Sequence, residues 1–195
     1  ALGISRAALT GGTVGAWAAT TVMSRATETH ASVAYNGYMY RFGGYQRGVG
    51  SYFESYSAPI NSNGTLGDWT HILDLPAAYT RPAITTYNGY MYLVADSAWS
   101  GGSPHVTAAT YYSKINSDGT LGSWVQTTSL PQAVVSHALV ATTGYIYTLG
   151  GSPTVGGACG ANNDCMDTVY YAPLNADGTI GGWATTTSFA TARAV

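Results

Sequence analysis

The side chains best suited to binding a ligand lie in three segments that each follow a tyrosine-rich stretch and differ from one another. Their aromatic, cationic and amide groups belong to Tyr45, Arg47, Trp99, His105, Asn162, Asn163 and Asp164. An aromatic face beside amide donors and acceptors is typical of sugar recognition. We therefore expect these residues to contact a glycan or a protein. The alternative for Trp99 is that its ring packs inside its own loop.

The third of these segments also offers oxygen ligands and two cysteines. The side chains that could gather around Ca²⁺ are those of Asn162, Asn163, Asp164 and Asp167, and a solvated polar loop is the alternative. We expect no other cofactor. Cys159 and Cys165 lack CxxC spacing and a second pair, so a zinc site is not indicated. We expect a local disulfide between them, with two free thiols as the alternative.

Catalytic signatures are missing from the sequence. It has no Gly-x-Ser-x-Gly motif and no phosphate-binding glycine loop, and its arginines are scattered. His30 and His137 occupy one repeat position, with Arg193 nearby in the next copy. We expect both histidines to be structural residues at a channel mouth, with a ligand contact as the alternative. These observations favour a protein that is not an enzyme.

Composition excludes several classes of partner. The net charge is −2 with Lys114 as the sole lysine, so no basic field exists for nucleic acid or an anionic membrane. No apolar run approaches the ~20 residues of a membrane span. Gly, Thr, Ser and Tyr dominate, which is typical of twisted strands joined by tight turns. Low lysine content and the cysteine pair favour an extracellular or cell-surface location.

One turn sequence recurs and organises the chain. Residues 116–124 read Asn-Ser-Asp-Gly-Thr-Leu-Gly-Ser-Trp, with close copies at 61–69 and 175–183 and a degenerate copy at 11–17. Asn or Asp before Gly is typical of a hairpin corner. A calcium-binding EF-hand loop is the alternative, but no copy has the Glu that such a loop needs at its twelfth position. The residues expected to fix the next strand are Trp17, Trp69, Trp124 and Trp183.

The same four strands are predicted in every repeat. The first strands are 31–35, 83–87 and 138–142, and the second are 38–42, 90–94 and 145–149. The third strands are 55–60, 110–115 and 169–174, and each fourth strand opens at a corner tryptophan. Four antiparallel strands in about 50 residues, repeated in tandem, form the blade of a β-propeller.

Three features link these repeats to a known class. They are the Tyr-x-Tyr-x-x-Gly-Gly of residues 38–44 and 145–151, the tryptophan opening each fourth strand, and the Leu-Pro at 75–76 and 130–131. On these residues the chain resembles the kelch / galactose-oxidase-like propellers. Oxidases of that class need a copper site with two Tyr, two His and a Cys bonded to a Tyr. Here both cysteines fall in one loop, so the resemblance does not extend to that site.

We expect an all-β fold, a β-propeller segment of four-stranded antiparallel blades forming about three and a half blades of an incomplete ring. The expected units are a partial blade at 1–29, three blades at 30–81, 82–136 and 137–190, and the first strand of a further blade at 191–195. Self-association could complete the ring. The alternative function is a fragment of a propeller enzyme, of oxidase or glycosidase type, whose catalytic residues lie in missing blades.

Strand direction separates the loops onto two faces. Turns between the first and second strands and between the third and fourth share one face, and they are short and repetitive. Loops between the second and third strands share the other face with the blade-to-blade crossings, and they vary. Variable loops on a rigid scaffold are where binding usually takes place, so we predict a binding or assembly module that uses this second face.

Overall fold

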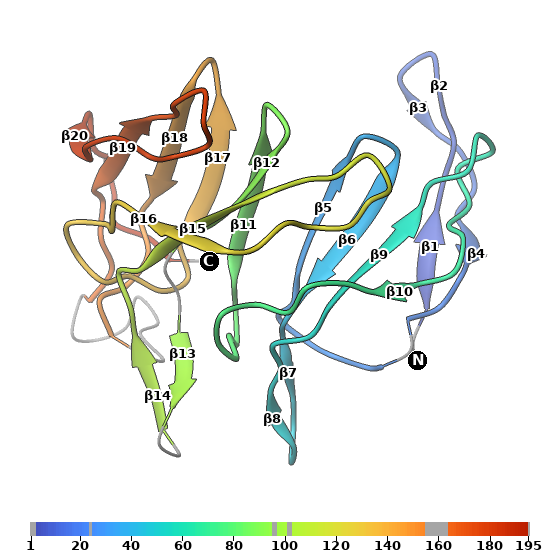
Figure 1. Cartoon of the computed structure of the whole chain (residues 1–195), viewed down its shortest axis with the longest axis horizontal. Helices are drawn as coiled ribbons and strands as arrows, with labels where there is room; N and C mark the ends of the chain where they lie inside the picture. The colour runs from blue at the N-terminus through green and yellow to red at the C-terminus, as the bar shows by residue number, and fades with distance from the viewer. Residues whose placement is uncertain (1–2, 24, 95–96, 101–102, 155–163, 195) are drawn as a thin grey trace.

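The computed structural model describes residues 3–23, 25–94, 97–100, 103–154 and 164–194, without the side chains of 99–100 and 103–104. Within these ranges the chain is all-β and contains no helix, and so no helix that could cross a membrane. Three four-stranded antiparallel sheets follow one another along the chain, preceded by a two-stranded one (Figure 1). This is the propeller-like arrangement of blades that the repeats predict.

The strands of the three complete blades fall where the sequence places them. The first blade is β5 (Ala31–Tyr35), β6 (Tyr38–Phe42), β9 (Ser55–Pro59) and β10 (Thr70–His71). The second blade is β11 (Ala83–Tyr87), β12 (Tyr90–Val94), β15 (Thr110–Lys114) and β16 (Val125–Thr127). The third blade is β17 (Ala138–Thr142), β18 (Tyr145–Leu149), β19 (Val169–Pro173) and β20 (Ala184–Thr186).

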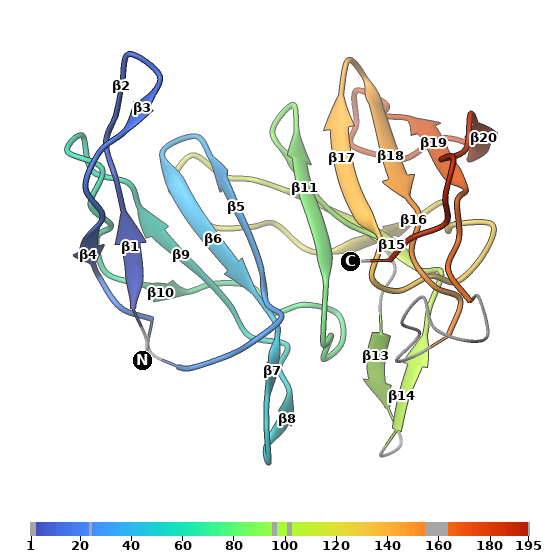
Figure 2. The ribbon, with the colours of Figure 1, turned by 180° about the vertical axis from the view of Figure 1, so that it is seen from behind.

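An outer half-blade precedes them. It consists of β1 (Ile4–Arg6) paired with β4 (Ala18–Thr20), and the small hairpin β2 (Leu9–Thr10) and β3 (Thr13–Val14) lies between the two. The first strands of successive blades, β5, β11 and β17, lie side by side (Figure 2). The first strand of each blade is therefore its innermost one, and the corners lie toward the outside.

Two predicted loops are hairpins instead. The segment after β6 forms β7 (Tyr45–Gln46) and β8 (Gly50–Ser51), and the segment after β12 forms β13 (Ser97–Ser100) and β14 (Ser103–Val106). We call these hairpins the first and second arms. Both extend from the side of the blades opposite the turns that join first and second strands (Figure 1). The variable face thus bears two projecting ribbons.

The hydrophobic core lies between consecutive blades. Tyr40 and Phe42 of the first blade are fully buried, and Ile115, Leu121 and Trp124 of the second blade pack in the same cluster. An equivalent cluster joins Tyr92 and Val94 of the second blade to Ile180 and Trp183 of the third. Corner residues of one blade therefore bury the face of the blade before it.

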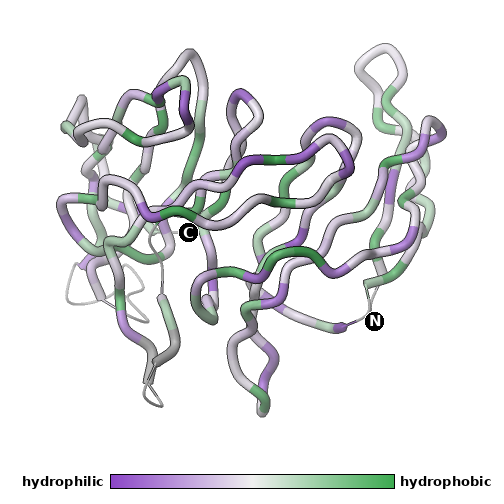
Figure 3. The backbone as a smooth tube through the Cα atoms, in the orientation of Figure 1, coloured by the Kyte–Doolittle hydropathy of each residue, from purple (hydrophilic) through white to green (hydrophobic). Residues whose placement is uncertain are grey.

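The turns follow the chemistry of their residues. Asn36 and Asn88 adopt φ of 46° and 48°, a left-handed conformation that Asn tolerates and that tight hairpins require. Figure 3 shows the tips of these two turns as hydrophilic. At the corner, the Thr120 backbone N–H and hydroxyl donate to Asp118 Oδ1 at 3.0 and 2.7 Å. One oxygen of the carboxylate that a calcium loop would need is therefore engaged by the turn itself.

Candidate functional site

A cavity lies where the inner strands of all three blades begin. It has a volume of about 430 Å³ and is lined by Thr29, His30, Arg81, Pro82, Ala83, Ser136 and His137. These residues come from equivalent positions at or just before β5, β11 and β17, which the propeller arrangement brings together. We call this the mouth cavity. It opens on the face from which the blade-to-blade crossings arrive.

Two residues before the inner strand, two of the three blades have an unusual backbone. Thr29 and Ser136 adopt φ of 58° and 54°, a left-handed conformation that costs energy for residues other than glycine. Arg81 is their equivalent and avoids it, because a residue before proline is held in an extended conformation. Local strain of this kind, repeated around one cavity, positions the side chains that line it.

Side chains of this position link neighbouring blades. The Thr29 hydroxyl donates to the carbonyl of Thr80 at 2.6 Å. The Arg81 Nη1 donates to Ser136 Oγ at 2.9 Å. Each bond joins the start of one blade to the crossing or inner strand of the next. Arg81 is thereby directed along the mouth while remaining exposed to solvent.

His137 is the most unusual group in the cavity lining. Its side chain is only 6% exposed, and among the described residues neither ring nitrogen has a hydrogen-bond partner. Burial disfavours the charged form and lowers the pKa of His137 to about 4, so the ring is neutral near pH 7. A buried imidazole whose nitrogens make no hydrogen bond is costly to the fold.

His30 holds the equivalent position in the first blade, but it is half-buried and its Nδ1 lies 3.5 Å from Thr27 Oγ1. The pKa of His30 is lowered by partial burial and, to a smaller degree, by the positive charge of Arg41. A glycine lies directly beneath each histidine, because a Cβ on Gly44 or Gly151 would come within 3.0 Å of the histidine Cβ. The second blade has Pro82 at the histidine position and no glycine pair after its second strand. A histidine at this position therefore occurs in the two blades that have a glycine pair after the second strand.

The mouth cavity has an uncompensated positive charge. Both histidines are neutral near pH 7, and Arg81 is the charged group among the lining residues. The ion pairs found within the described ranges, Arg25–Glu54 and His71–Asp74, lie elsewhere. None of the described residues that line the cavity carries a carboxylate. A guanidinium with neutral hydrogen-bonding neighbours is suited to hold an anionic oxygen group.

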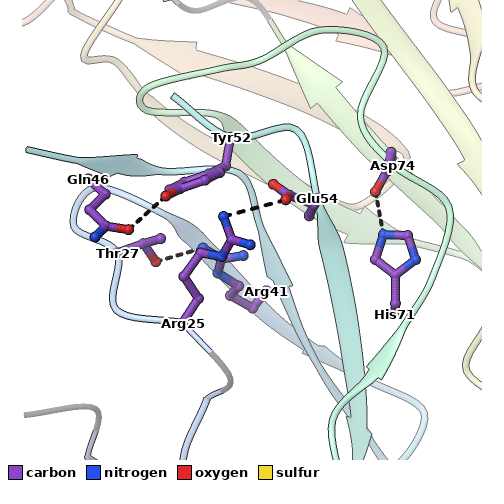
Figure 4. Close-up of polar contacts among 8 residues, drawn as sticks. All are labelled: Arg25, Thr27, Arg41, Gln46, Tyr52, Glu54, His71 and Asp74. Atoms are coloured by element: carbon purple, nitrogen blue, oxygen red, sulfur yellow. Dashed lines mark hydrogen bonds and ion pairs between the residues drawn. The ribbon is translucent and has the colours of Figure 1, made fainter. Parts of the chain in front are cut away.

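A second hollow of about 430 Å³ lies at the base of the first arm, and we call it the arm hollow. Its lining residues are Ala26, Thr27, Glu28, Tyr45, Gln46 and Arg47. The backbones of Glu28 and Tyr45 exchange two hydrogen bonds of 2.8 and 2.9 Å, which fix the arm to the crossing. The Tyr52 hydroxyl donates to Gln46 Oε1 at 2.6 Å (Figure 4). The structure thus brings two predicted binding residues, Tyr45 and Arg47, into one hollow.

Two arginine side chains contact the residues next to the arm hollow. Arg41 is 3% exposed and donates from Nη2 to Thr27 Oγ1 at 2.6 Å (Figure 4). Arg25 lies 4.6 Å from the ring centre of Tyr52, with its guanidinium 3.7 Å from Glu54. Burial lowers the pKa of Arg41, but its group stays charged at neutral pH. These contacts hold Thr27 at the edge of the hollow.

The remaining predicted residues lie apart from these two cavities. Trp99 lies in β13 opposite Pro104, and His105 lies exposed in β14 opposite Ala98, so both belong to the second arm. The Trp99 side chain falls outside what the structure describes. The predicted glycan-binding set is therefore divided between two arms and the third blade rather than gathered in one place.

The polar loop of the third blade is only partly described. Asn162, Asn163 and Cys159 lie outside the described residues, so the calcium site and the disulfide stay predictions. Asp164 accepts a 3.3 Å hydrogen bond from the Thr154 hydroxyl, Asp167 is exposed, and Cys165 is buried. In the part of the chain that the structure covers, no group of three or more His, Cys, Asp or Glu side chains could hold a metal ion.

Sequence reasoning missed the three polar residues Thr29, Arg81 and Ser136 among those that line the mouth cavity. Thr29, Arg81 and Ser136 share one repeat position immediately before the histidine position. The signal was the register itself, since this column holds a polar residue in all three blades. Arg81 was read only as one of several scattered arginines, because linear separation hides residues that a repeat returns to one axis.

Comparison with known proteins gives the fold and nothing finer. No protein-family model matches the sequence, and no curated protein matches it. A solved structure titled "Structure of YjhT" is similar, with a TM-score of 0.69 and 13% sequence identity. The match covers 92% of this chain and 58% of that one, so this chain spans 58% of the length of that protein. At this identity the likeness shows a shared propeller-like arrangement of blades.

Proposed function

We propose that this chain is a non-enzymatic binding module that recognises an acidic glycan on its variable face. The observation that carries the proposal is the guanidinium of Arg81 in the mouth cavity, which donates to Ser136 but has no carboxylate partner among the described residues, beside the His137 ring, whose nitrogens have no hydrogen-bond partner there. In this proposal a carboxylate of the ligand accepts hydrogen bonds from Arg81. The His137 ring supplies a further polar contact once the ligand is in place.

The neighbouring surface suits the rest of a sugar chain. The arm hollow combines the ring of Tyr45 with the amide of Gln46 and the guanidinium of Arg47. Aromatic faces with convergent amide and charged donors are the usual means of holding a sugar. The second arm, which includes Trp99 and His105, extends from the same face (Figure 1). A ligand longer than one residue could contact the mouth and an arm together.

The lining of the mouth does not favour catalysis. Glycosidases act through two carboxylates on either side of the scissile bond, and the lining residues include none. Neither hydroxyl there is activated by a base, because Thr29 donates to a backbone carbonyl and Ser136 accepts from Arg81. The kelch-like class and an extracellular location remain part of the proposal, supported by the repeat motifs and the composition.

Binding to matched glycans tests the proposal. We expect the protein to bind carboxylate-bearing glycans and to bind their carboxamide counterparts at least about tenfold more weakly, since charged hydrogen bonds contribute roughly 1.5–3 kcal/mol. Arg81→Gln should abolish this preference. Lys114→Gln removes the same charge from an exposed residue at the far end of the third strand and should change nothing. Equal binding of both glycans, or an unchanged preference in Arg81→Gln, would reject the site.

A further inference from the structure

The crossing from the first blade to the second is paired with both arms. Tyr79 on this crossing forms one antiparallel bridge with Tyr52, directly after the first arm, and another with Ala98 in β13 of the second arm. The carbonyl of Tyr79 also accepts a 3.1 Å hydrogen bond from the Gly44 N–H, and the Tyr52 N–H donates to the Gly44 carbonyl at 2.8 Å. The backbone therefore joins the bases of both arms to the segment that leads into the mouth cavity.

Thr80, the next residue, bonds to a different part of the candidate site through each of its three polar groups. Its hydroxyl shares a 2.7 Å hydrogen bond with the hydroxyl of Ser51 in the first arm. Its N–H donates to the Ser97 carbonyl in the second arm at 3.1 Å, and its carbonyl accepts from the Thr29 hydroxyl at the mouth at 2.6 Å. Arg81, the cation of the mouth cavity, follows directly. One residue thus links both arms to the mouth.

The hydroxyl bond of Thr80 is an addition to the repeated framework. Glu28 and Val135 hold the position of Thr80 in the first and third blades. The N–H of each donates to a backbone carbonyl at 2.9 Å, so the backbone bond is made in every blade. The valine has no polar side-chain group, and Glu28 lines the arm hollow. The fold is therefore built without a hydroxyl at this position in two blades, and Thr80 adds a contact to an arm in one.

We propose that Thr80 is a positioning residue, which holds the first arm in register with Arg81 so that one oligosaccharide contacts the mouth cavity and the arm hollow together. For the nature of the ligand, this inference rests on the proposed function. Ser51 pairs with Tyr45 in the hairpin of the first arm, and Tyr45 lines the arm hollow. The bond between Thr80 and Ser51 therefore fixes the strands of that arm relative to the mouth. Fixing both places before binding lowers the cost of ordering a ligand that uses both.

Hydrogen exchange of the free protein tests this link without any ligand. Thr80→Val removes the hydroxyl, retains the backbone bonds and nearly retains the side-chain volume. We expect the amides of residues 45–52 to exchange at least about fivefold faster, because loss of the bond lowers the free energy of local opening. Ser51→Ala should have the same effect, and the double variant should exchange no faster than either single one.

Two variants control for general loosening of the crossing and of the second blade. Thr80→Ser keeps the hydroxyl and should exchange like the unaltered protein. Thr86→Val changes another half-buried threonine, on the inner strand of the same blade, and should leave residues 45–52 unaffected. Unchanged exchange of residues 45–52 in Thr80→Val, or fully additive effects of Thr80→Val and Ser51→Ala, would overturn the proposal.

The dependence of binding on glycan length separates positioning from a merely structural role. We use galacturonic acid and its linear tetramer as probes in calorimetric titrations. Thr80→Val should bind the single sugar as the unaltered protein does, because Arg81 is retained. Its gain in affinity from the single sugar to the tetramer should be smaller by at least about fivefold. Arg81→Gln, in contrast, should weaken binding of both probes.

The outcomes of the titrations separate this inference from the proposed function. An equal loss for both probes in Thr80→Val, or an unchanged gain from single sugar to tetramer, would overturn the positioning role. If the unaltered protein binds neither probe, the proposed function fails for uronic acids. The exchange series then decides by itself whether Thr80 couples the first arm to the mouth.

Discussion

The corners and the mouth cavity are both built from equivalent repeat positions, but they differ in how those positions vary. In all three complete corners the threonine N–H and hydroxyl donate to an Asx oxygen at 3.0 and 2.7 Å. At the mouth, one position holds Thr29, Arg81 and Ser136 in turn. The corners make the same two hydrogen bonds in every copy, whereas at the mouth the same backbone position bears three different side chains.

The difference separates what the fold needs from what a ligand would need. A corner must satisfy its own turn and cover the preceding blade, so every copy meets the same constraint. The residues at the mouth face a shared cavity, where three identical side chains would crowd one axis. Variation at a position whose backbone is strained in two copies is therefore a sign of adaptation to something outside the repeat.

The largest expected effect tests the corner as a packing element. Gly178→Ala places a Cβ within 2.6 Å of the Tyr90 ring at a φ of 89°, so overpacking adds to backbone strain. We expect a loss of roughly 4 kcal/mol in the free energy of unfolding, measured by urea denaturation. Gly144→Ala has a similar φ of 82° and no atom within 4 Å of the added Cβ, so it should cost only about 1 kcal/mol. Equal costs would show that the corner does not pack tightly.

Strand positions could be predicted from the sequence because several local signals agree. Asn36-Gly37 and Asn88-Gly89 define hairpins, and the alternating strands on either side leave only one register. The first arm was predicted as a loop because β7 and β8 have two residues each, too few for a periodic pattern. Such short hairpins cannot be predicted from their own sequence, because the blade to which they are attached fixes where their strands start.

The mouth was predicted only in part. His30 and His137 were placed at a channel mouth from their shared repeat position, but the role of Arg81 depends on an axis that linear spacing does not reveal. The exposed fraction of a corner tryptophan could not be predicted from its repeat position. Trp17 occupies the corner position of Trp124 yet is 70% exposed, because burial of a corner depends on the preceding blade and not on the corner sequence.

The next prediction tests the mouth through His137. A pKa lowered from 6.5 to about 4 means that the unfolded chain binds a proton more readily than the folded one. The stabilisation from the neutral ring is complete above pH 6.5 and is lost as the pH falls toward 4, by about 3 kcal/mol at pH 4. His137→Leu should remove this pH dependence in urea denaturation between pH 4 and 7.

The same variant distinguishes a structural histidine from a ligand contact. If the ring only fills space, His137→Leu should leave binding of the acidic glycan unchanged while stability rises at low pH. Our proposal expects binding to weaken as well. His71→Leu is the matched control, because this histidine is exposed beside Asp74 outside the mouth. Weaker binding in His71→Leu would show that the effect is not specific to the mouth.

The smallest effect belongs to the corner carboxylates. Hydrogen bonds from Thr120 and Thr179 lower the pKa of Asp118 and Asp177 below 3.8. The stabilisation that they contribute is complete above pH 3.8 and is lost as the pH falls through the lower folded pKa values.

The first corner makes the same bonds through the neutral amide of Asn63, at 3.0 and 2.7 Å. Asp118→Asn with Asp177→Asn should therefore fold normally and lose a little of the acid sensitivity. Thermal unfolding at pH 3 and pH 7 measures this. A large destabilisation at pH 7 would mean that the corner needs the charge and not only the hydrogen bonds, and the corners would then resemble the mouth in depending on electrostatics.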